Sequence, residues 1–345
     1  MVFGKKGIIG LDIGSGYIKV VQLKDTKEGY ELELFDILPL LPELIVDGSI
    51  IDSLRVGESF KELIKKAKIK TKDVVIGMAG HSSVIVKRVS LPEMTEEELS
   101  ESIRFEAEQY IPFNIEDVNL DFQILGPKEE AGQMDVILVA VKKDIINEYL
   151  SVVKEAGLNP VIVDVNSFAL ENIYEINYEI EPDKNIALVN IGASTLNLNI
   201  LKGGISVFTR DSAVGSNLHT EAIQKEFNLP YESAEKLKRG ESVGNVSPAD
   251  AMSVIEAASD EIIGEVGRSL EYFHEDINEV ILSGGCALMK DFPARLAEKI
   301  GIEVKVMEPF KNIKVPKKFD ITYIEDMAPI AAVAAGLALR RQGDR

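Results

Sequence analysis

The amino-acid sequence predicts an α/β fold made of two similar halves. Apolar runs of strand length alternate along the chain with longer stretches of helical period, a pattern typical of mixed sheets joined by crossover helices. Residues 9–23 match residues 187–201 strand over strand when Asp12 is placed over Asn190, an offset of 190 − 12 = 178 residues. The 345 residues are 46% hydrophobic and 28% charged, so two domains of ordinary size with buried cores are expected.

Each element follows from its local pattern. Short apolar and β-branched runs predict strands at 7–13, 17–23, 31–38, 74–79, 84–90, 119–125, 135–141, 160–165, 186–191, 195–201, 205–209 and 279–283. Longer amphipathic or apolar stretches predict helices near 53–67, 143–155, 166–176, 213–227, 247–273, 287–300 and 329–340. The longest apolar stretch, 328–339, is about half as long as the roughly 20 residues of a membrane-spanning helix, so a buried helix is expected there.

One further helix is marked at both ends. Thr95 and Glu98 form a capping box, which predicts the start of a helix, and Pro112 is expected to end it. The apolar face of this helix carries Leu99, Ile103, Ala107 and Tyr110.

The charge balance limits the partners. The chain has 57 acidic and 38 basic residues, a formal net charge of −19, which disfavours general binding to nucleic acid and attraction to anionic lipid. Proteins or small molecules are the expected partners. A single cysteine, Cys286, excludes an internal disulfide framework and fits the reducing cytosol. The short apolar run at the N-terminus is interrupted by Asp12, so neither a signal peptide nor a membrane anchor is expected there.

The segment GLDIGSGYIK near the N-terminus predicts a tight turn that binds phosphate. Gly14 and Gly16 can adopt backbone angles barred to other residues and leave space for an anion, so successive N–H groups can face phosphate oxygens. Ser15 adds a hydroxyl donor and Lys19 a positive charge. Asp12 fits such a site if a hydrated Mg²⁺ lies between its carboxylate and the phosphate. The alternative is an ordinary hairpin with a surface lysine.

The repeat favours the phosphate interpretation. The second copy, LVNIGASTLN at 188–197, has the same layout, and two such hairpins facing each other across a cleft can clamp a polyphosphate. The sequence has neither the G-x-x-x-x-G-K-[ST] pattern of P-loop ATPases nor a G-x-G-x-x-G pattern that opens a helix. None of the three histidines has a partner at metal-ligand spacing, so each is expected to be structural or exposed.

These segments resemble the actin superfamily. DIGSGYIK is similar to its first phosphate loop and NIGASTLN to its second, while VDVNSFAL (163–170), ILSGGCALMKDF (281–292) and APIAAVAAGLAL (328–339) resemble its first connecting helix, adenosine loop and second connecting helix. The resemblance implies an actin-like ATPase fold of duplicated RNase H-like domains that binds ATP with Mg²⁺. The residues implied in nucleotide binding are Gly14, Ser15, Gly16, Lys19, Gly192, Ala193, Ser194, Thr195, Gly215, Gly284 and Gly285, with Asp12 holding the metal through water.

A further segment, AEKLKRG at 234–240, resembles the adenine-contacting helix of heat-shock chaperones in this superfamily. The resemblance implies that Glu235, Lys238 and Arg239 lie near the nucleoside. A charged, solvent-exposed helix face is the alternative. Cys286, beside the glycine pair that ends a predicted strand, is expected to be a small packed residue.

Asn190 departs from the superfamily pattern. The resemblance implies an aspartate at this position, which helps to hold the metal-bound and attacking waters, and an amide can neither carry the negative charge nor accept a proton. ATP binding with weak hydrolysis is therefore expected. The resemblance leaves Asp164 as the candidate to orient water, besides Asp12 at the metal. The alternative for Asp164 is a simple strand cap.

Within the superfamily, residues 91–125 resemble the relocated subdomain shared by the cell-division protein FtsA and the PilM family of type IV pilus assembly proteins, and the Glu-rich helix leading into QYIPF resembles PilM specifically. FtsA proteins carry a C-terminal amphipathic membrane helix, and nothing comparable follows GLALRRQGDR. The PilM resemblance implies a cytoplasmic adaptor that holds the N-terminal cytoplasmic tail of a PilN-like inner-membrane protein and links this platform to the pilus motor ATPase. It implies no direct membrane insertion and leaves self-association open.

The same resemblance divides the chain into two domains, 1–165 and 166–345. The first includes an inserted subdomain at about 80–142, and the last helix, 328–340, packs back on the cleft between the domains. Apolar residues of the inserted subdomain such as Ile111 and Phe113 are expected to contact the partner's tail. An FtsA-like division scaffold and a small-molecule kinase of the same superfamily remain the alternative functions.

Overall fold

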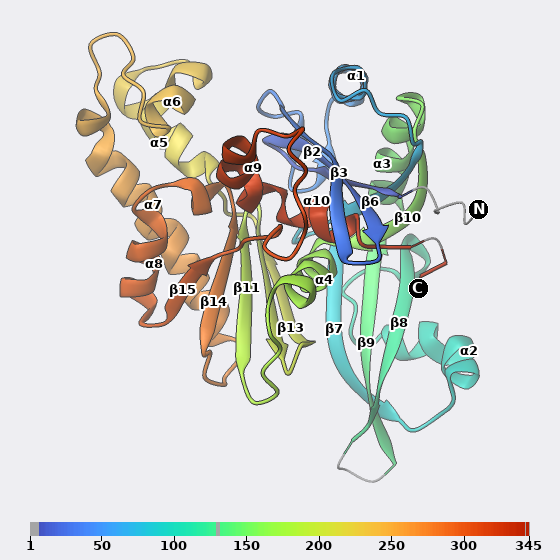
Figure 1. Ribbon diagram of the computed structural model, residues 1–345. Helices are drawn as coiled ribbons and strands as arrows, with labels where there is room; N and C mark the ends of the chain where they lie inside the picture. The colour runs from blue at the N-terminus through green and yellow to red at the C-terminus, as the bar shows by residue number, and fades with distance from the viewer. Residues whose placement is uncertain (1–6, 129–131, 342, 345) are drawn as a thin grey trace.

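Two five-stranded sheets of the same topology dominate the computed structural model, which describes residues 7–128, 132–341 and 343–344 (Figure 1). The first sheet has the order β10-β6-β1-β2-β3 and the second the order β13-β12-β11-β14-β15. The strands of the first sheet are β1 (Ile9–Ile13), β2 (Tyr17–Thr26), β3 (Gly29–Pro39), β6 (Asp73–Met78) and β10 (Asn159–Val165). Those of the second are β11 (Asn185–Ile191), β12 (Leu196–Lys202), β13 (Ile205–Ser212), β14 (Glu279–Gly284) and β15 (Glu303–Val306).

The strand registers confirm the repeat predicted from the sequence. β1 runs antiparallel to β2 and parallel to β6, and β11 runs antiparallel to β12 and parallel to β14. Asp12 lies opposite Lys19 in the first pair, and Asn190 lies opposite Asn197 in the second. Equivalent residues are 178 positions apart in both cases, so the two hairpins are true structural copies.

A third, smaller sheet is inserted into the first half of the chain, between β6 and α3. It consists of β7 (Val84–Pro92), β9 (Gln133–Lys142) and β8 (Val118–Pro127), with α2 (Glu96–Ala107) and the 3₁₀ turn Ile115–Asp117 packed against it. Thr95 caps α2 through the predicted capping box with Glu98. The helix ends at Ala107, earlier than predicted, because a turn that includes Tyr110 and Ile111 precedes Pro112.

The helices that accompany the two large sheets are α1 (Ser53–Lys66), α3 (Lys143–Glu155), α4 (Asn166–Asn177), α7 (Pro248–Glu271), α8 (Phe292–Ile300), α9 (Ile321–Met327) and α10 (Ala332–Leu337), with 3₁₀ turns at Gly285–Leu288 and Ala328–Ala331. Two further helices, α5 (Asn217–Phe227) and α6 (Tyr231–Lys238), pack with α7 around a small core of their own. The elements that sequence patterns did not predict are α9, β15, the 3₁₀ turn Ile115–Asp117 and the short hairpin of β4 (Ile45–Val46) and β5 (Ser49–Ile50). α6 was expected only from the resemblance at 234–240.

Small residues allow α10 to join the two halves. A Cβ added at Gly336 would lie 1.7 Å from the carbonyl oxygen of Ala169 on α4, and one at Gly10 on β1 would lie 2.0 Å from that of Ala334. A shared core, with Val21 from the first sheet and Leu188 from the second, packs around this crossing. The apolar stretch at 328–339 is therefore a buried 3₁₀ turn and helix, as predicted. Among the described residues, no helix is both long and apolar enough to cross a membrane.

Candidate functional site

The two hairpin tips face each other across one cleft. The turn of the first hairpin is closed by a bond from the Gly14 backbone N–H to the Tyr17 carbonyl (3.0 Å), and the second by the equivalent bond from Gly192 to Thr195 (2.9 Å). The hydroxyl groups of Ser15 and Ser194 are hydrogen-bonded at 2.7 Å, so the tips touch. The cleft, including its open mouth, holds about 790 Å³ of atom-free space.

Most of the residues predicted for the site line this cleft. They are Asp12, Gly14, Ser15, Gly16, Lys19, Asn190, Gly192, Ala193, Ser194, Thr195, Gly284 and Gly285. The five that do not line it are Asp164, Gly215, Glu235, Lys238 and Arg239. The sequence repeat therefore located the hairpin residues that line the cleft. The five residues that do not line the cleft were candidates on other grounds than the repeat.

The hairpin tips present free backbone donors. The N–H groups of Ser15, Gly16, Ala193 and Ser194 have no hydrogen-bond acceptor among the residues that the structure describes. Convergent N–H groups of this kind form a concave site for an anion. The arrangement can bind phosphate oxygens from both sides without any change in the strands.

The glycines of the first tip are required for space and not for special backbone angles. Neither Gly14 nor Gly16 has a φ in the left-handed region, contrary to the sequence prediction, but a Cβ at Gly16 would lie 2.9 Å from the Cβ of Ala193. Gly284 combines both needs, since its φ is +85° and its Cβ would lie 2.3 Å from the Ile191 carbonyl oxygen. Gly215 supports the second tip from behind, where a Cβ would lie 2.4 Å from the carbonyl oxygen of Ala193.

The first hairpin carries a charged pair inside the cleft. Lys19 Nζ lies 2.7 Å from Asp12 Oδ2, and the two side chains are only 13% and 8% exposed. Asp12 is the one carboxylate among the described residues that line the cleft. A carboxylate held in place by a lysine can accept hydrogen bonds from water bound to Mg²⁺, while the ammonium group can contact phosphate.

The second hairpin carries amides at the same two places. Asn190 Nδ2 donates to Asn197 Oδ1 at 3.1 Å, and the Ser283 hydroxyl donates to Asn190 Oδ1 at 3.2 Å. Asn190 and Asn197 form a row of amides, and Asp211 stands next in it, because it pairs with Asn197 between β12 and β13. The Asp211 carboxylate accepts a hydrogen bond from the Gly80 backbone N–H at 3.0 Å. Burial raises the pKa of Asp211, and the hydrogen bond from the Gly80 backbone N–H opposes that shift. The row links the cleft to the loop before β7.

Asp164 lies outside the cleft. Arg340 holds its carboxylate with two hydrogen bonds, at 2.7 and 3.1 Å, and the Val165 N–H donates to it as well. Asn166, two residues later at the start of α4, lines the cleft instead, and its buried Oδ1 has no partner among the described residues. The strand-to-helix boundary in VDVNSF marks this region in the sequence but does not show which of the two side chains turns inward.

Other cleft residues were also not found from the sequence, among them Tyr149 and Asn197. Tyr149, from α3, is buried in the cleft wall, and burial next to the Asp12 carboxylate raises its pKa. Asn197 lies opposite Asn190. The one sequence signal for Asn197 is that it corresponds to Lys19 in the repeat, since 197 − 19 gives the same offset of 178 residues.

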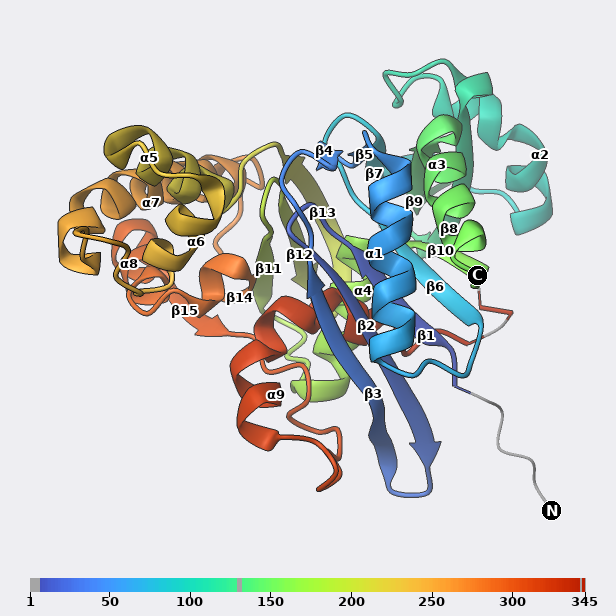
Figure 2. The ribbon, with the colours of Figure 1, turned by 90° about the horizontal axis from the view of Figure 1, so that it is seen from above.

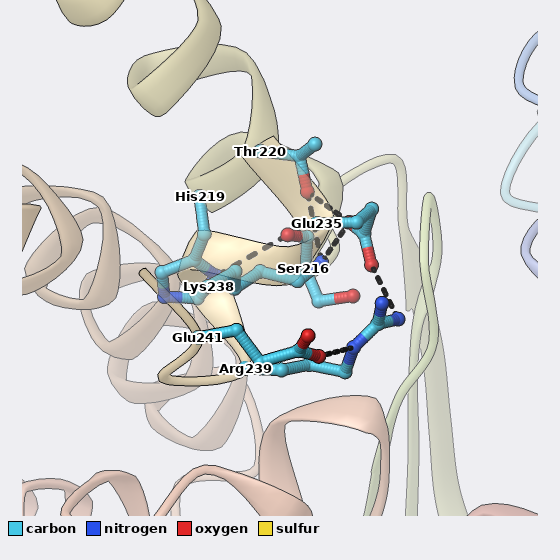
Figure 3. Close-up of polar contacts among 7 residues, drawn as sticks. All are labelled: Ser216, His219, Thr220, Glu235, Lys238, Arg239 and Glu241. Carbon is cyan, nitrogen blue, oxygen red and sulfur yellow. Dashed lines mark hydrogen bonds and ion pairs between the residues drawn. The ribbon is translucent and has the colours of Figure 1, made fainter. Parts of the chain in front are cut away.

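The candidate nucleoside residues form a second cluster on α5 and α6 (Figure 3). Glu235 contacts both Thr220 and Lys238, and Lys238 Nζ also donates to the Thr220 hydroxyl at 2.8 Å. Arg239 lies 3.9 Å from Glu235 and 3.6 Å from Glu241. The side chains of Glu235 and Lys238 are nearly buried, so this is not a solvated helix face.

This cluster is connected to the cleft through Tyr17 of the first hairpin. Burial and the Glu235 charge raise the pKa of Tyr17, and a hydrogen bond with Arg239 opposes the shift. Tyr17 itself lines the cleft. Glu235 and Arg239 therefore lie beside the cleft, on the side of α6, although they do not form its wall.

His219 and Cys286 are buried packing residues. His219 is fully buried, contacts Ser259 Oγ at 2.9 Å through Nε2, and has its pKa lowered to about 4 by burial. Burial raises the pKa of the Cys286 thiol to about 12. Both side chains are neutral at pH 7, and Cys286 is the packed residue that the sequence indicated.

Comparisons with known proteins agree with this geometry. The model of a family described as type IV pilus assembly protein PilM matches residues 10–342. A solved chain of the PilM-PilN type IV pilus biogenesis complex is 30% identical, with a TM-score of 0.85, over 97% of this chain and 98% of that chain. MreB5 of Spiroplasma citri bound to AMPPNP is 15% identical, with a TM-score of 0.53, over 96% of this chain and 95% of that one. These structural likenesses confirm the predicted actin-like fold.

A curated relative matches more distantly. The cell division protein FtsA of Helicobacter pylori strain J99 is 25% identical over 233 residues, which cover 56% of this chain. The match spans 47% of that relative's own length, about half of it.

Proposed function

Because this chain belongs to the PilM family of type IV pilus assembly proteins, we propose that it is a cytoplasmic, actin-like ATP-binding adaptor of the inner-membrane assembly platform. In this role it holds the N-terminal cytoplasmic tail of a PilN-like membrane protein and hydrolyses ATP slowly or not at all. The observation that carries the proposal is the pair of touching hairpin tips with free backbone N–H groups and one lysine–carboxylate pair.

The donors fit the phosphates of ATP and a hydrated Mg²⁺. The hairpin N–H groups, Ser15 and Lys19 would hold phosphate oxygens, and Asp12 would hold water on the metal. When bound, the metal would neutralise phosphate charge. The MreB5 structure named above was solved with AMPPNP, which supports a nucleotide in this fold. Glu235, Lys238 and Arg239 would contact the nucleoside from α6.

The same residues explain why turnover is expected to be slow. An attacking water needs a group that can accept its proton, and the side chains at 166, 190 and 197 are amides. Asp12 is already bonded to Lys19, and Asp164 is held by Arg340 outside the cleft. The cleft therefore binds and orients the triphosphate without supplying a free general base.

The inserted sheet is the proposed docking region for the tail. Ile111 is buried in the core of this region, which removes it from the contacts expected from the sequence, and Phe113 is partly buried with Lys142 Nζ 4.6 Å from its ring centroid. Phe105 on α2 is 71% exposed and is the better apolar contact. A synthetic PilN-like tail should protect residues 80–142 from hydrogen exchange. Protection confined to 231–300 would place the partner elsewhere.

The function is tested by isothermal titration of the full chain with Mg-ATP and with the tail peptide. Saturable binding of both is expected, and failure of either removes one half of the proposal. Phosphorylation of any member of a sugar panel would favour the kinase alternative. Salt-resistant flotation with vesicles would favour an FtsA-like scaffold. Cross-linking in the assembled platform tests the further parts of the proposal, contact with the motor ATPase and self-association.

A further inference from the structure

A lysine-rich surface lies at the end of α1 and in the loop that leads to β6. Six exposed lysines occur within twelve residues: Lys61, Lys65, Lys66, Lys68, Lys70 and Lys72. Residues 61–73 contain only two acids, Glu62 and Asp73, so the segment has a formal charge of +4 in a chain of −19. Only Lys66 forms an ion pair among the described residues, with Asp36 at 2.7 Å. We call the other five the lysine surface.

The backbone holds this surface in one fixed shape. The Ile69 N–H donates to the Ile64 carbonyl at 3.1 Å, which closes the end of α1, and Lys68 has the left-handed φ of +51° that usually belongs to glycine at this place. The Lys72 carbonyl then accepts the Asn159 N–H at 2.7 Å. The loop is thus fastened at both ends.

The side chains alternate between outside and inside. Along the loop Lys68, Lys70 and Lys72 are exposed, while Ile69 and Thr71 are half-buried. Ile69 packs on the core below, and Thr71 Oγ1 accepts from Gln22 Nε2 at 3.3 Å. Lys61 and Lys65 are four residues apart and share the outer face of α1. Figure 2 shows α1 over the first sheet, with its end continuing into this loop.

We propose that the lysine surface makes an electrostatic contact with anionic phospholipid headgroups. Clusters of four to eight basic residues bind anionic leaflets, because each lysine near such a surface contributes about fivefold in partition. The contact would be peripheral, without insertion. This inference goes beyond the proposed function, which brings the chain to the membrane only through a protein tail.

The chemistry of the surface favours lipid over a protein or nucleic acid. Lysine is a hydrated point charge, whereas recognition of carboxylates or phosphates in a protein or RNA partner favours the planar fork of arginine and aromatic platforms, and residues 61–72 contain neither. Within residues 61–73 no large apolar side chain is exposed, and Leu54, the nearest one before this segment, lies at the opposite end of α1. The segment itself therefore lacks the apolar centre of a protein interface.

The overall negative charge does not forbid the contact. Charges are screened beyond about 8–10 Å at physiological salt, so only groups close to the headgroups contribute. Lys65 lies in the last turn of α1 and Lys72 in the loop after it. Glu62 and Asp73 are the only acids of this segment. Asp52 caps the opposite end of α1, about 20 Å away along a helix of 14 residues. The net charge of −19 belongs to the whole chain, whereas residues 61–73 are locally positive.

The test is co-sedimentation of the full chain with vesicles of phosphatidylcholine alone or with about one third phosphatidylglycerol. The wild type should partition to the anionic vesicles at low salt, with loss at about 0.5 M salt. The variant Lys65→Gln/Lys68→Gln/Lys70→Gln should partition at least tenfold less. Its matched control is Lys225→Gln/Lys290→Gln/Lys317→Gln, which removes three exposed lysines without ion pairs elsewhere and should behave as wild type.

Three outcomes would overturn the proposal: no salt-sensitive partition of the wild type, a loss in the control variant equal to that in the lysine variant, or wild-type partition of the lysine variant. If an acidic protein bound to the lysine surface and vesicles did not, the surface would belong to a protein partner and the proposal would be wrong. A melting temperature equal to wild type checks that the variant is folded. Neither nucleotide nor tail peptide is present, so the outcome is separate from the titrations that test the proposed function.

Discussion

The two hairpins of the cleft have the same backbone and different chemistry. Each begins on a central strand, turns within four residues and closes with the same bond, Gly14 to Tyr17 in the first and Gly192 to Thr195 in the second. The first places a carboxylate opposite a lysine, whereas the second places two amides opposite each other. The backbone donors for phosphate are thus duplicated, while the charged groups for a metal and for phosphate are present once.

This difference separates binding from turnover. In the proposed function, the backbone N–H groups and the one ion pair would hold a metal-bound polyphosphate, and both are present in the cleft. Proton transfer from water needs a further group of suitable basicity, which the second hairpin does not supply. The predictions below test this division of roles between the two copies.

The largest effect is expected when the second hairpin is made more like the first. Asn190→Asp should raise single-turnover ATP hydrolysis by about 10²–10⁴-fold, because a carboxylate can position and deprotonate water. Binding should change less than turnover, since the backbone donors are untouched. Asn190→Ser is the control and should stay slow. Equal rates for Asn190→Asp and wild type would show that domain closure or a missing partner limits turnover.

The converse change in the first hairpin should act on binding. Asp12→Asn and Lys19→Gln should each weaken Mg-ATP binding about 10–100-fold, because charge-assisted contacts of about 1.5–3 kcal/mol are lost. Changes at the equivalent positions of the second hairpin, Asn190→Ala and Asn197→Ala, should weaken Mg-ATP binding less than about fivefold. Isothermal titration measures all four. Similar losses in both hairpins would contradict the division of roles.

The two serines should behave alike, because they share one hydrogen bond across the cleft. Ser15→Ala and Ser194→Ala should each weaken Mg-ATP binding about two- to tenfold, the usual contribution of one neutral hydrogen bond. The double variant should lose less than the sum of the two free-energy changes, since the partners act together. Strict additivity would indicate that the two hydroxyls contact different parts of the ligand.

The smallest effect concerns the carboxylate at the end of the amide row. Asp211 has no cation at ion-pair distance among the described residues, and burial raises its pKa in the folded chain. Its contribution to stability is therefore full below the unfolded pKa near 3.8 and is lost as pH rises through the higher folded pKa. Relative to wild type, Asp211→Asn should gain stability as the pH rises from 4 to 7, seen as an increasing difference in melting temperature.

Thermal melts at several pH values measure this gain. The exposed Asp291→Asn is the matched control and should follow wild type at every pH. Parallel curves for wild type and Asp211→Asn would refute the role given to burial.

Local patterns were sufficient to predict the duplicated part of the molecule. The offset of 178 residues identifies both hairpins because strand, turn and strand repeat within fifteen consecutive residues. The capping box at Thr95 is equally local, and so is the small-residue stretch that becomes α10. In these cases the residues that determine the structure are neighbours in the sequence.

The residues that sequence patterns misplaced depend on distant partners. Asp164 is turned away from the cleft by Arg340, 176 residues later, and no pattern near either residue shows that pairing. Tyr149 enters the cleft only because α3 packs against β5, which is distant from it in the sequence. The space required at Gly16 is set by Ala193 of the other hairpin, so a rule about backbone angles of glycine could not give the reason.

The central claim is that the wild-type cleft binds Mg-ATP and leaves it intact. The most direct measurement mixes an excess of the full chain with γ-labelled ATP and Mg²⁺, and follows bound label by filter retention and hydrolysis by chromatography in the same samples. The account predicts that the label is retained and is recovered as ATP after an hour. Absence of retention, or release of most of the label as phosphate within that hour, would contradict it.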